Sequence, residues 1–247
     1  MLCPVVPICD LVTDIPKAEC DALMNIYSNN GGDNWYNKTG WGTADKVCTW
    51  GYTPWTGVTC TDGHVTALDL YNNNLTGGFA ITQGNLNSLT NLSLSYNQLT
   101  SFSNAGLGAL TSLALTHNSL TSFDATGLAA LTSLQLGENL LTSVQNTDVL
   151  VNIGTPVFHG GQYPWTESFA YLNANCLRES ALSAPLLSWV KTYAPYQWNV
   201  LNPNGLCPEA PPSPVTVTCS PSITSAITGQ PVTWTATPSG GEWDIYL

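Results

Sequence analysis

The segment Leu89-Thr-Asn-Leu-Ser-Leu-Ser-Tyr-Asn97-Gln-Leu-Thr-Ser-Phe102 occurs three times in closely related form. The second and third copies are Leu110-Thr-Ser-Leu-Ala-Leu-Thr-His-Asn118-Ser-Leu-Thr-Ser-Phe123 and Leu131-Thr-Ser-Leu-Gln-Leu-Gly-Glu-Asn139-Leu-Leu-Thr-Ser-Val144. The asparagines recur every 21 residues, and a fourth related copy, Val65–Leu75, lies upstream. A fixed period of this length, with apolar positions and an asparagine in register, indicates a solenoid in which each copy forms one coil.

The leucine-x-leucine pattern in each copy predicts a short strand whose leucines point inward, because successive side chains of a strand alternate between its faces. No single copy can bury its own leucines, so neighbouring coils must stack to cover them. The asparagine after each strand turns the chain, and its side-chain amide can bond to backbone groups that the turn would otherwise bury without partners. The expected inward leucines are Leu92, Leu94, Leu113, Leu115, Leu134 and Leu136.

A second set of motifs precedes the repeats. The first is a predicted helix with Asp14 as its expected N-cap and an expected end near Asn30-Gly31-Gly32. The helix is followed by Gly32-Asp-Asn-Trp35, then by Cys48-Thr-Trp50, and by Gly57-Val-Thr-Cys60 shortly before the first leucine pair. Together with the L-x-x-L-x-L-x-x-N-x-L repeat, this order resembles the N-terminal cap of plant-receptor-type leucine-rich repeat proteins, which bacterial secreted and cell-surface repeat proteins share. The chain departs from that pattern by the insertion Gly51–Pro54. The resemblance implies two disulfides, Cys48–Cys60 and Cys9–Cys20.

The repeat pattern fades after Val144, and Pro156–Phe158 is the expected last, degenerate strand. Further on, a cysteine, a predicted helix that begins at Ser183 and contains a tryptophan, a second tryptophan and a closing cysteine follow one another. This order resembles the C-terminal cap of the same bacterial proteins. It implies a third disulfide, Cys176–Cys207.

The end of the chain has a different composition. Residues 208–214 are rich in proline and predict a stiff linker. Residues 215–247 alternate as strands do, and they resemble the start of a bacterial immunoglobulin-like or polycystic-kidney-disease-type domain. These 33 residues are too few for a sandwich of about seven strands. An incomplete sheet has open edges, which allow self-association through this C-terminal β segment.

We therefore expect an α/β repeat fold, namely a short leucine-rich repeat solenoid with disulfide-bonded N- and C-terminal caps and a β-rich C-terminal tail. The expected parts are an N-terminal helical cap with disulfides (1–62), about four to five leucine-rich repeats (63–157), a C-terminal cap with a helix (158–207), a Pro-rich linker (208–214) and a partial immunoglobulin-like β segment (215–247).

The charge balance restricts the partners of this chain. It has 5 basic and 16 acidic residues, and no lysine or arginine occurs from Val47 to Leu177. Nucleic acids and anionic membranes bind through cations, so we expect neither as a partner. No apolar stretch reaches the roughly 20 residues of a membrane span. The expected partner is a protein or a glycan.

The eight cysteines predict an oxidising compartment, because their spacing does not form paired zinc-binding motifs. We expect an extracellular or cell-surface protein. The N-terminal residues do not read as a secretory leader, so we expect that a leader has been removed or that the chain is a piece of a larger protein. Cys3 and Cys219 stay unassigned: they could pair with each other, bond another subunit or be free.

Catalytic motifs are not evident. The three histidines are far apart in sequence, and nucleophile, zinc-protease, phosphate-loop and dinucleotide motifs are missing. The repeat pattern does not place two carboxylates opposite each other, as a glycosidase requires. We expect a non-catalytic protein without cofactor or metal.

The outward residues of the predicted strands form the candidate binding surface, which would be the concave face of the solenoid. Tyr71 and Tyr96 favour a binding role, because tyrosine is frequent in binding sites. Most other side chains on this face are small and uncharged, which favours the alternative that the face is only solvated.

Aligned threonines could bind ice, but turn chemistry explains them. The N-terminal tryptophans could pack the cap or offer a platform for sugars. The candidate residues are Asp69, Tyr71, Asn91, Ser93, Ser95, Tyr96, Thr116, His117, Gln135 and Glu138.

Two hypotheses about function follow. The first is a non-catalytic recognition or adhesion module of a bacterial surface or secreted protein, which binds through the repeat face or the caps. The second is a structural subunit of an extracellular filament or surface layer, which assembles through the C-terminal β segment and unpaired cysteines. A ligand-free polymer would distinguish the second from the first.

Overall fold

A computed structural model describes residues 7–48, 54–82, 84–147, 153, 169–171, 175, 216–221 and 234–239. The chain divides into two compact units, residues 1–207 and residues 208–247. The first unit is mostly β and has a solenoid-like stacked arrangement. No helix in the described part of the chain has the length and apolar character that crossing a membrane requires.

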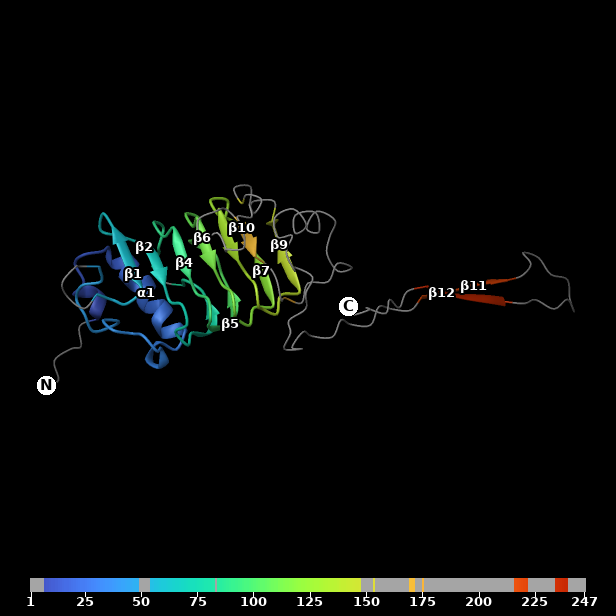
Figure 1. The fold of residues 1–247 in the computed structure, drawn as a ribbon, viewed down its shortest axis with the longest axis horizontal. Helices are drawn as coiled ribbons and strands as arrows, with labels where there is room; N and C mark the ends of the chain where they lie inside the picture. Colours follow the sequence, from blue (N-terminus) through green and yellow to red (C-terminus); the bar gives the residue numbers. More distant parts are fainter. Residues whose placement is uncertain are drawn as a thin grey trace, which may run out of the picture. The chain divides into compact units, whose positions relative to one another are not determined.

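Short parallel strands, one from each coil, form the main sheet of the first unit (Figure 1). The sheet begins with an antiparallel pair, β1 (Val58–Thr61) and β2 (His64–Asp69). The parallel strands β4 (Asn91–Ser93), β6 (Ser112–Ala114), β8 (Ser133–Gln135) and β10 (Phe169–Tyr171) continue it in the order β1-β2-β4-β6-β8-β10. Leu92 pairs with Leu113, and Leu113 with Leu134. The 21-residue period of the sequence therefore sets the register in which neighbouring strands pair.

A second set of strands lies further along each coil. β3 (Thr76–Phe79) pairs in parallel with β5 (Gln98–Phe102), and β7 (Ser122–Asp124) pairs in parallel with β9 (Ser143–Gln145). Phe79, Phe102 and Phe123 stack inside this set, with ring centroids 5.6 and 6.0 Å apart. The coil is thus tied to its neighbours on two sides.

The leucine positions of the repeat form a continuous buried column. Burial of one leucine side chain contributes about 1.5–3 kcal/mol, so the column accounts for a large part of the stabilisation. The six leucines that we expected to point inward are at most 2% exposed, which confirms the predicted alternation; they are Leu92, Leu94, Leu113, Leu115, Leu134 and Leu136.

The asparagines form a ladder beside this column. The side-chain amide of Asn97 donates to the carbonyls of Leu70 and Leu94 at 2.8 and 2.9 Å, and its Oδ1 accepts from the backbone N–H of Leu75 at 2.9 Å. Asn118 and Asn139 make equivalent bonds, so each of these three asparagines satisfies the backbone of its own coil and of the preceding coil. At the ends of the ladder, the side chain of Asn175 bonds to the preceding coil, and the side chain of Asn73 bonds to the backbone of Asn37 in the N-terminal segment.

Asn175 shows where the final coil of the described sheet ends. Its side chain donates to the carbonyl of Leu136 at 2.9 Å and accepts from the N–H of Leu141 at 3.0 Å. The strand beside β8 is Phe169–Tyr171. The segment Pro156–Phe158, which we expected to be the last strand, lies outside the described residues. The sequence pattern missed this strand because the last interval between ladder asparagines is longer than 21 residues.

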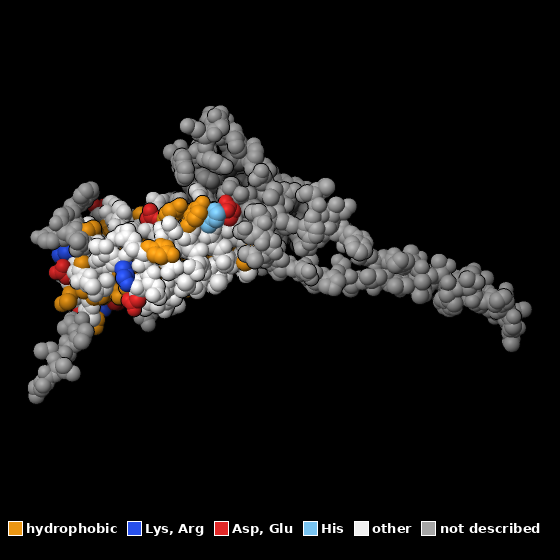
Figure 2. Space-filling model, turned by 60° about the horizontal axis from the view of Figure 1, so that its bottom comes forward, with side chains coloured by type: hydrophobic (Ala, Val, Ile, Leu, Met, Phe, Trp, Pro, Cys, Tyr) orange, Lys and Arg blue, Asp and Glu red, His pale blue; other side chains and the backbone are white. Residues whose placement is uncertain are grey.

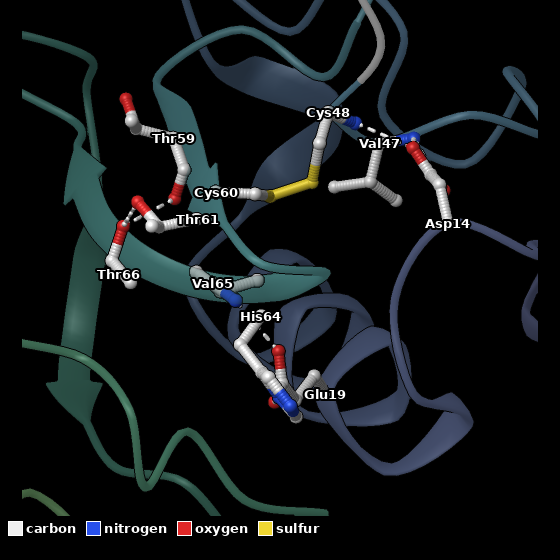
Figure 3. Close-up of a disulfide and its surroundings, with 10 residues drawn as sticks. All are labelled: Asp14, Glu19, Val47, Cys48, Thr59, Cys60, Thr61, His64, Val65 and Thr66. Atoms are coloured by element: carbon white, nitrogen blue, oxygen red, sulfur yellow. Dashed lines mark hydrogen bonds and ion pairs between the residues drawn. A yellow bond between two sulfur atoms is a disulfide. The ribbon is translucent and has the colours of Figure 1, made fainter.

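The N-terminal segment (residues 1–62) contains the helix α1 (Lys17–Asn29). The 3-10 turn η1 (Ile8–Asp10) precedes this helix, and the 3-10 turn η2 (Gly32–Asn34) follows it. The helix ends at Asn30 and the left-handed Gly31, as the sequence predicts. We expected Asp14 to cap its N-terminus, but Pro16 occupies the cap position. Asp14 instead accepts hydrogen bonds from the N–H groups of Val47 and Cys48, which are distant in sequence (Figure 3).

Two disulfides are present, Cys9–Cys20 and Cys48–Cys60, and they are the pairs that the resemblance implies. Figure 3 shows the second of them. The third expected pair, Cys176–Cys207, lies outside the described residues, as do Cys3 and the predicted helix that begins at Ser183.

The second unit contains one antiparallel pair, β11 (Thr216–Pro221) and β12 (Trp234–Ser239), in which Cys219 lies opposite Ala236. No third strand joins this pair within the described residues. The linker 208–214 lies outside them.

Candidate functional site

A left-handed residue follows the main-sheet strand in each of four consecutive coils. Asn72, Tyr96, His117 and Glu138 have φ values of 47°, 60°, 54° and 54°. This conformation costs a residue with a side chain about 1–2 kcal/mol. The backbone is held there by neighbouring coils, since Tyr96 N donates to Thr116 O at 2.8 Å and His117 N to Gly137 O at 3.0 Å. The side chains therefore project from equivalent points of successive coils.

Three of these side chains form one row with Tyr71, which precedes Asn72; we call this row the ridge, and its members are Tyr71, Tyr96, His117 and Glu138. The ring centroids of Tyr71 and Tyr96 are 5.1 Å apart, and those of Tyr96 and His117 are 4.0 Å apart. His117 Nε2 lies 2.7 Å from Glu138 Oε2. The row is visible along the upper edge of the described surface, where a pale blue histidine lies between orange and red side chains (Figure 2).

The ridge is accessible in spite of these contacts. Tyr71 is 54% and Tyr96 45% exposed, and the side chains of His117 and Glu138 are 35% and 34% exposed. Most of the surrounding surface in the same view carries neither charge nor hydrophobic side chains (Figure 2). The ridge is thus a chemically distinct strip that combines aromatic rings with one carboxylate.

Burial raises the pKa of Tyr96 above its ordinary value, and the neighbouring Tyr71 and Glu138 raise it further. The phenol therefore stays protonated at neutral pH, so that its hydroxyl can donate a hydrogen bond to a ligand.

The other candidate residues divide into two groups. Asp69 and Asn91 are exposed, and Ser93 and Gln135 are partly exposed on β4 and β8. Asp69 Oδ1 also accepts a hydrogen bond from Tyr71 N at 3.1 Å, so Asp69 fixes the turn in which the ridge begins. These four residues accompany the ridge along the face.

Ser95 and Thr116 differ from our expectation, because they are only 6% and 9% exposed. Each lies beyond the end of its strand, between an inward leucine and a left-handed residue, so the alternation of a strand does not apply to it. Within the described part of the chain, neither hydroxyl has a hydrogen-bond partner. Both residues support the ridge and do not present their side chains to a ligand.

The threonine ladder is occupied by internal hydrogen bonds. The hydroxyls of Thr90, Thr111 and Thr132 each donate to the carbonyl of the equivalent threonine in the preceding coil, at 3.1, 3.1 and 3.0 Å. These hydroxyls hold the coils together, which explains the threonines without an ice-binding surface.

Three tryptophans of the N-terminal segment are also structural. Trp35, Trp41 and Trp55 are 4%, 3% and 0% exposed, and each indole N–H donates to a backbone carbonyl. Buried rings offer no platform for a sugar, so packing is their role.

One polar cluster in this segment was not anticipated. Glu19 is 3% exposed, its Oε1 lies 2.6 Å from His64 Nδ1, and its Oε2 accepts from Val65 N at 2.7 Å (Figure 3). The cluster fastens α1 to the first strands of the sheet. Sequence reasoning missed it because the partners are 45 and 46 residues apart.

A metal site is not evident in the described ranges, since no three histidine, cysteine, aspartate or glutamate side chains gather there. A scan against protein-family models found no match, and a search of curated proteins found none either. The ridge geometry is therefore the main basis for a functional assignment.

Proposed function

We propose that this chain is a leucine-rich repeat protein with capped ends that acts as a non-catalytic recognition or adhesion module of a bacterial surface or secreted protein. The observation that carries this proposal is the ridge, Tyr71–Tyr96–His117–Glu138. Tyrosine is enriched among residues that contribute most to binding, and each ring offers a large contact area at a small cost in conformational entropy.

The strained backbone supports a binding role for the ridge. Glycine adopts a left-handed conformation without strain, yet tyrosine, histidine and glutamate occupy these positions. Residues held in unfavourable backbone regions gather at functional sites. A large side chain at each of these points is better explained by a ligand than by folding.

The repeat and the disulfides support the family and the location. The leucine column and asparagine ladder match what the L-x-x-L-x-L-x-x-N-x-L pattern requires of stacked coils. The disulfides Cys9–Cys20 and Cys48–Cys60 agree weakly with an extracellular environment, because such bonds persist where the surroundings are oxidising.

The test is binding of the purified chain to arrays of defined glycans and defined proteins. The wild-type chain, a Tyr96→Ala/His117→Ala variant and a Tyr71→Ala variant are compared with Leu11→Ala. Leu11 is a matched control because it is 50% exposed and lies in the N-terminal segment. We expect both ridge variants to lose a signal that Leu11→Ala retains. A signal unaffected by either ridge variant would refute the ridge as the binding site.

A structural subunit is the second candidate. The observation in its favour is the two-stranded sheet β11–β12, to which no further strand is added in the described residues. Exposed strand edges pair readily with other chains. Sedimentation and negative-stain microscopy of the ligand-free chain distinguish the two functions: polymers would favour assembly, and a monomer would favour recognition.

A further inference from the structure

We infer that the ridge binds a basic segment of a partner protein, with arginine or lysine side chains lying against Tyr71 and Tyr96 and their charges facing Glu138 and Asp69. This inference rests on the proposed function, because it names the class of ligand for the same site.

The electric field around the ridge favours a cationic ligand. The net charge of the chain is −11, and residues 47–177 contain no lysine or arginine. Within the described part of the chain, the lysines lie at positions 17, 38 and 46, in the N-terminal segment. Lys17 is already paired with Asp10 and Asp21, at 3.1 and 3.0 Å. An anionic ligand would meet no lysine or arginine on the ridge, whereas a basic segment would be attracted from a distance by the net negative charge.

The pair of exposed tyrosine rings can bind a cation. A cation within about 6 Å of an aromatic centroid is attracted to the ring face, and arginine makes this contact more often than lysine. The ring centroids of Tyr71 and Tyr96 lie 5.1 Å apart with an interplanar angle of 53°, so the two rings adjoin each other on the ridge. Both remain about half exposed, as contact with a side chain requires.

Two carboxylates lie at the ends of the ridge. Glu138 lies at one end of the ridge, where His117 Nε2 holds its Oε2 at 2.7 Å. Asp69 lies at the other end, where its Oδ1 is bonded to Tyr71 N. The two oriented carboxylates therefore lie at the two ends of the ridge, where successive basic side chains of a segment lying along it can face them. Hydrogen bonds between ionised partners are shorter and stronger than those between neutral ones.

A neutral glycan could also stack on the rings. It would gain hydrogen bonds from Glu138 and His117 but nothing from the net charge. The uncompensated negative charge therefore favours the basic segment.

The experiment uses the full chain and a capped peptide of Gly-Ser-Arg repeats, with the same peptide carrying glutamine for arginine as the ligand control. Affinity is measured by isothermal titration calorimetry at about 10 and about 150 mM ionic strength, where the Debye length is about 30 and 8 Å. We expect the arginine peptide to bind measurably tighter than the glutamine peptide at both salt concentrations.

Two matched pairs of variants locate the contact. Glu138→Gln and Asp45→Asn remove the same charge, but Asp45 lies in the N-terminal segment away from the ridge. We expect Glu138→Gln to weaken binding about three- to fivefold and Asp45→Asn less than about twofold. Tyr71→Leu should weaken binding about two- to fivefold, whereas Tyr71→Phe, which keeps the ring, should stay close to wild type.

The inference is overturned if Glu138→Gln and Asp45→Asn weaken binding equally and the two Tyr71 variants do not differ, because the peptide would then sense only the net charge. A parallel titration with neutral oligosaccharides of glucose, xylose and N-acetylglucosamine separates this failure from failure of the proposed function. If a glycan binds and Tyr71→Leu abolishes it while the two peptides bind alike, the basic ligand is wrong and recognition stands. If neither the peptides nor the glycans respond to any ridge variant, the proposed ridge function fails as well.

Discussion

His117 Nε2 and Glu138 Oε2 lie 2.7 Å apart, although the two residues are in different coils. They occupy equivalent positions, each directly before a ladder asparagine and each in the left-handed conformation. The contact therefore follows from the repeat itself: the 21-residue period brings together whatever side chains occupy this position. The same position carries Tyr96 one coil earlier, which extends the contact into the ridge.

The strain at the ridge can be measured by comparing Glu138→Gly with Glu138→Ala. Both variants lose the contact with His117, but only glycine adopts φ of 54° without a steric penalty. We expect the glycine variant to be more stable by about 1 kcal/mol, since the left-handed penalty exceeds the entropic cost of glycine. Urea unfolding followed by circular dichroism measures the difference. A more stable alanine variant would show that the backbone at this position is not strained.

Replacing the buried hydroxyl of Thr116 should stabilise the chain, whereas most substitutions in a core destabilise it. Because this hydroxyl lacks a partner among the described residues, Thr116→Val should raise the free energy of unfolding by about 1 kcal/mol. Thr111→Val is the matched control, since its hydroxyl donates to Thr90 O at 3.1 Å, and it should destabilise the chain. Denaturant unfolding of both variants provides the comparison, and destabilisation by both would mean that Thr116 is hydrogen-bonded.

The asparagine ladder predicts a large effect from a single amide. Asn118→Ala removes donors to Leu94 O and Leu115 O, both at 3.0 Å, and leaves Leu99 N–H without its acceptor. We expect a loss of about 2–4 kcal/mol from these buried, unpaired groups. Asn91→Ala, on the exposed side of β4, should change stability by no more than about 0.5 kcal/mol. Thermal unfolding of the two variants checks the contrast, and equal effects would contradict a ladder role.

The hydrogen bonds of Asp124 should make the stability of the chain decrease at acidic pH. The side chain of Asn146 lowers the pKa of Asp124, and the backbone and hydroxyl of Thr126 lower it further. A depressed folded pKa contributes stability that is fully present above the ordinary value of 3.8 and is lost as the pH falls through the folded pKa. Wild type should therefore lose more stability than Asp124→Asn between about pH 5 and about pH 2.

Asn146→Gly is the control for this titration. It removes the largest cause of the lowered pKa, at a residue whose φ of 54° glycine tolerates. Its acid-dependent loss should be intermediate between that of wild type and that of Asp124→Asn. Identical pH profiles for all three chains, measured by urea unfolding, would exclude the hydrogen bonds of Asp124 as the source.

The sequence by itself determined the stacked coils. Leucines at fixed spacing can be buried only by their equivalents in the next coil, so the period specifies the register, as the pairing of Leu92 with Leu113 confirms. It also provided all four ridge residues as candidates, because they lie at outward positions of the repeat. Local periodicity is sufficient for both conclusions.

Tertiary structure alone decided what that periodicity does not encode. Asn175 joins the ladder across a longer interval, which no fixed period could locate. Asp14 binds distant amides in place of capping the adjacent helix, since long-range packing outweighs a local preference. Ser95 and Thr116 are buried, and Tyr96, His117 and Glu138 come into contact, because the chain turns left-handed after each strand and neighbouring coils hold it there. The sequence thus determined which side chains face outward from each coil, and the stacking of coils decided which of them meet.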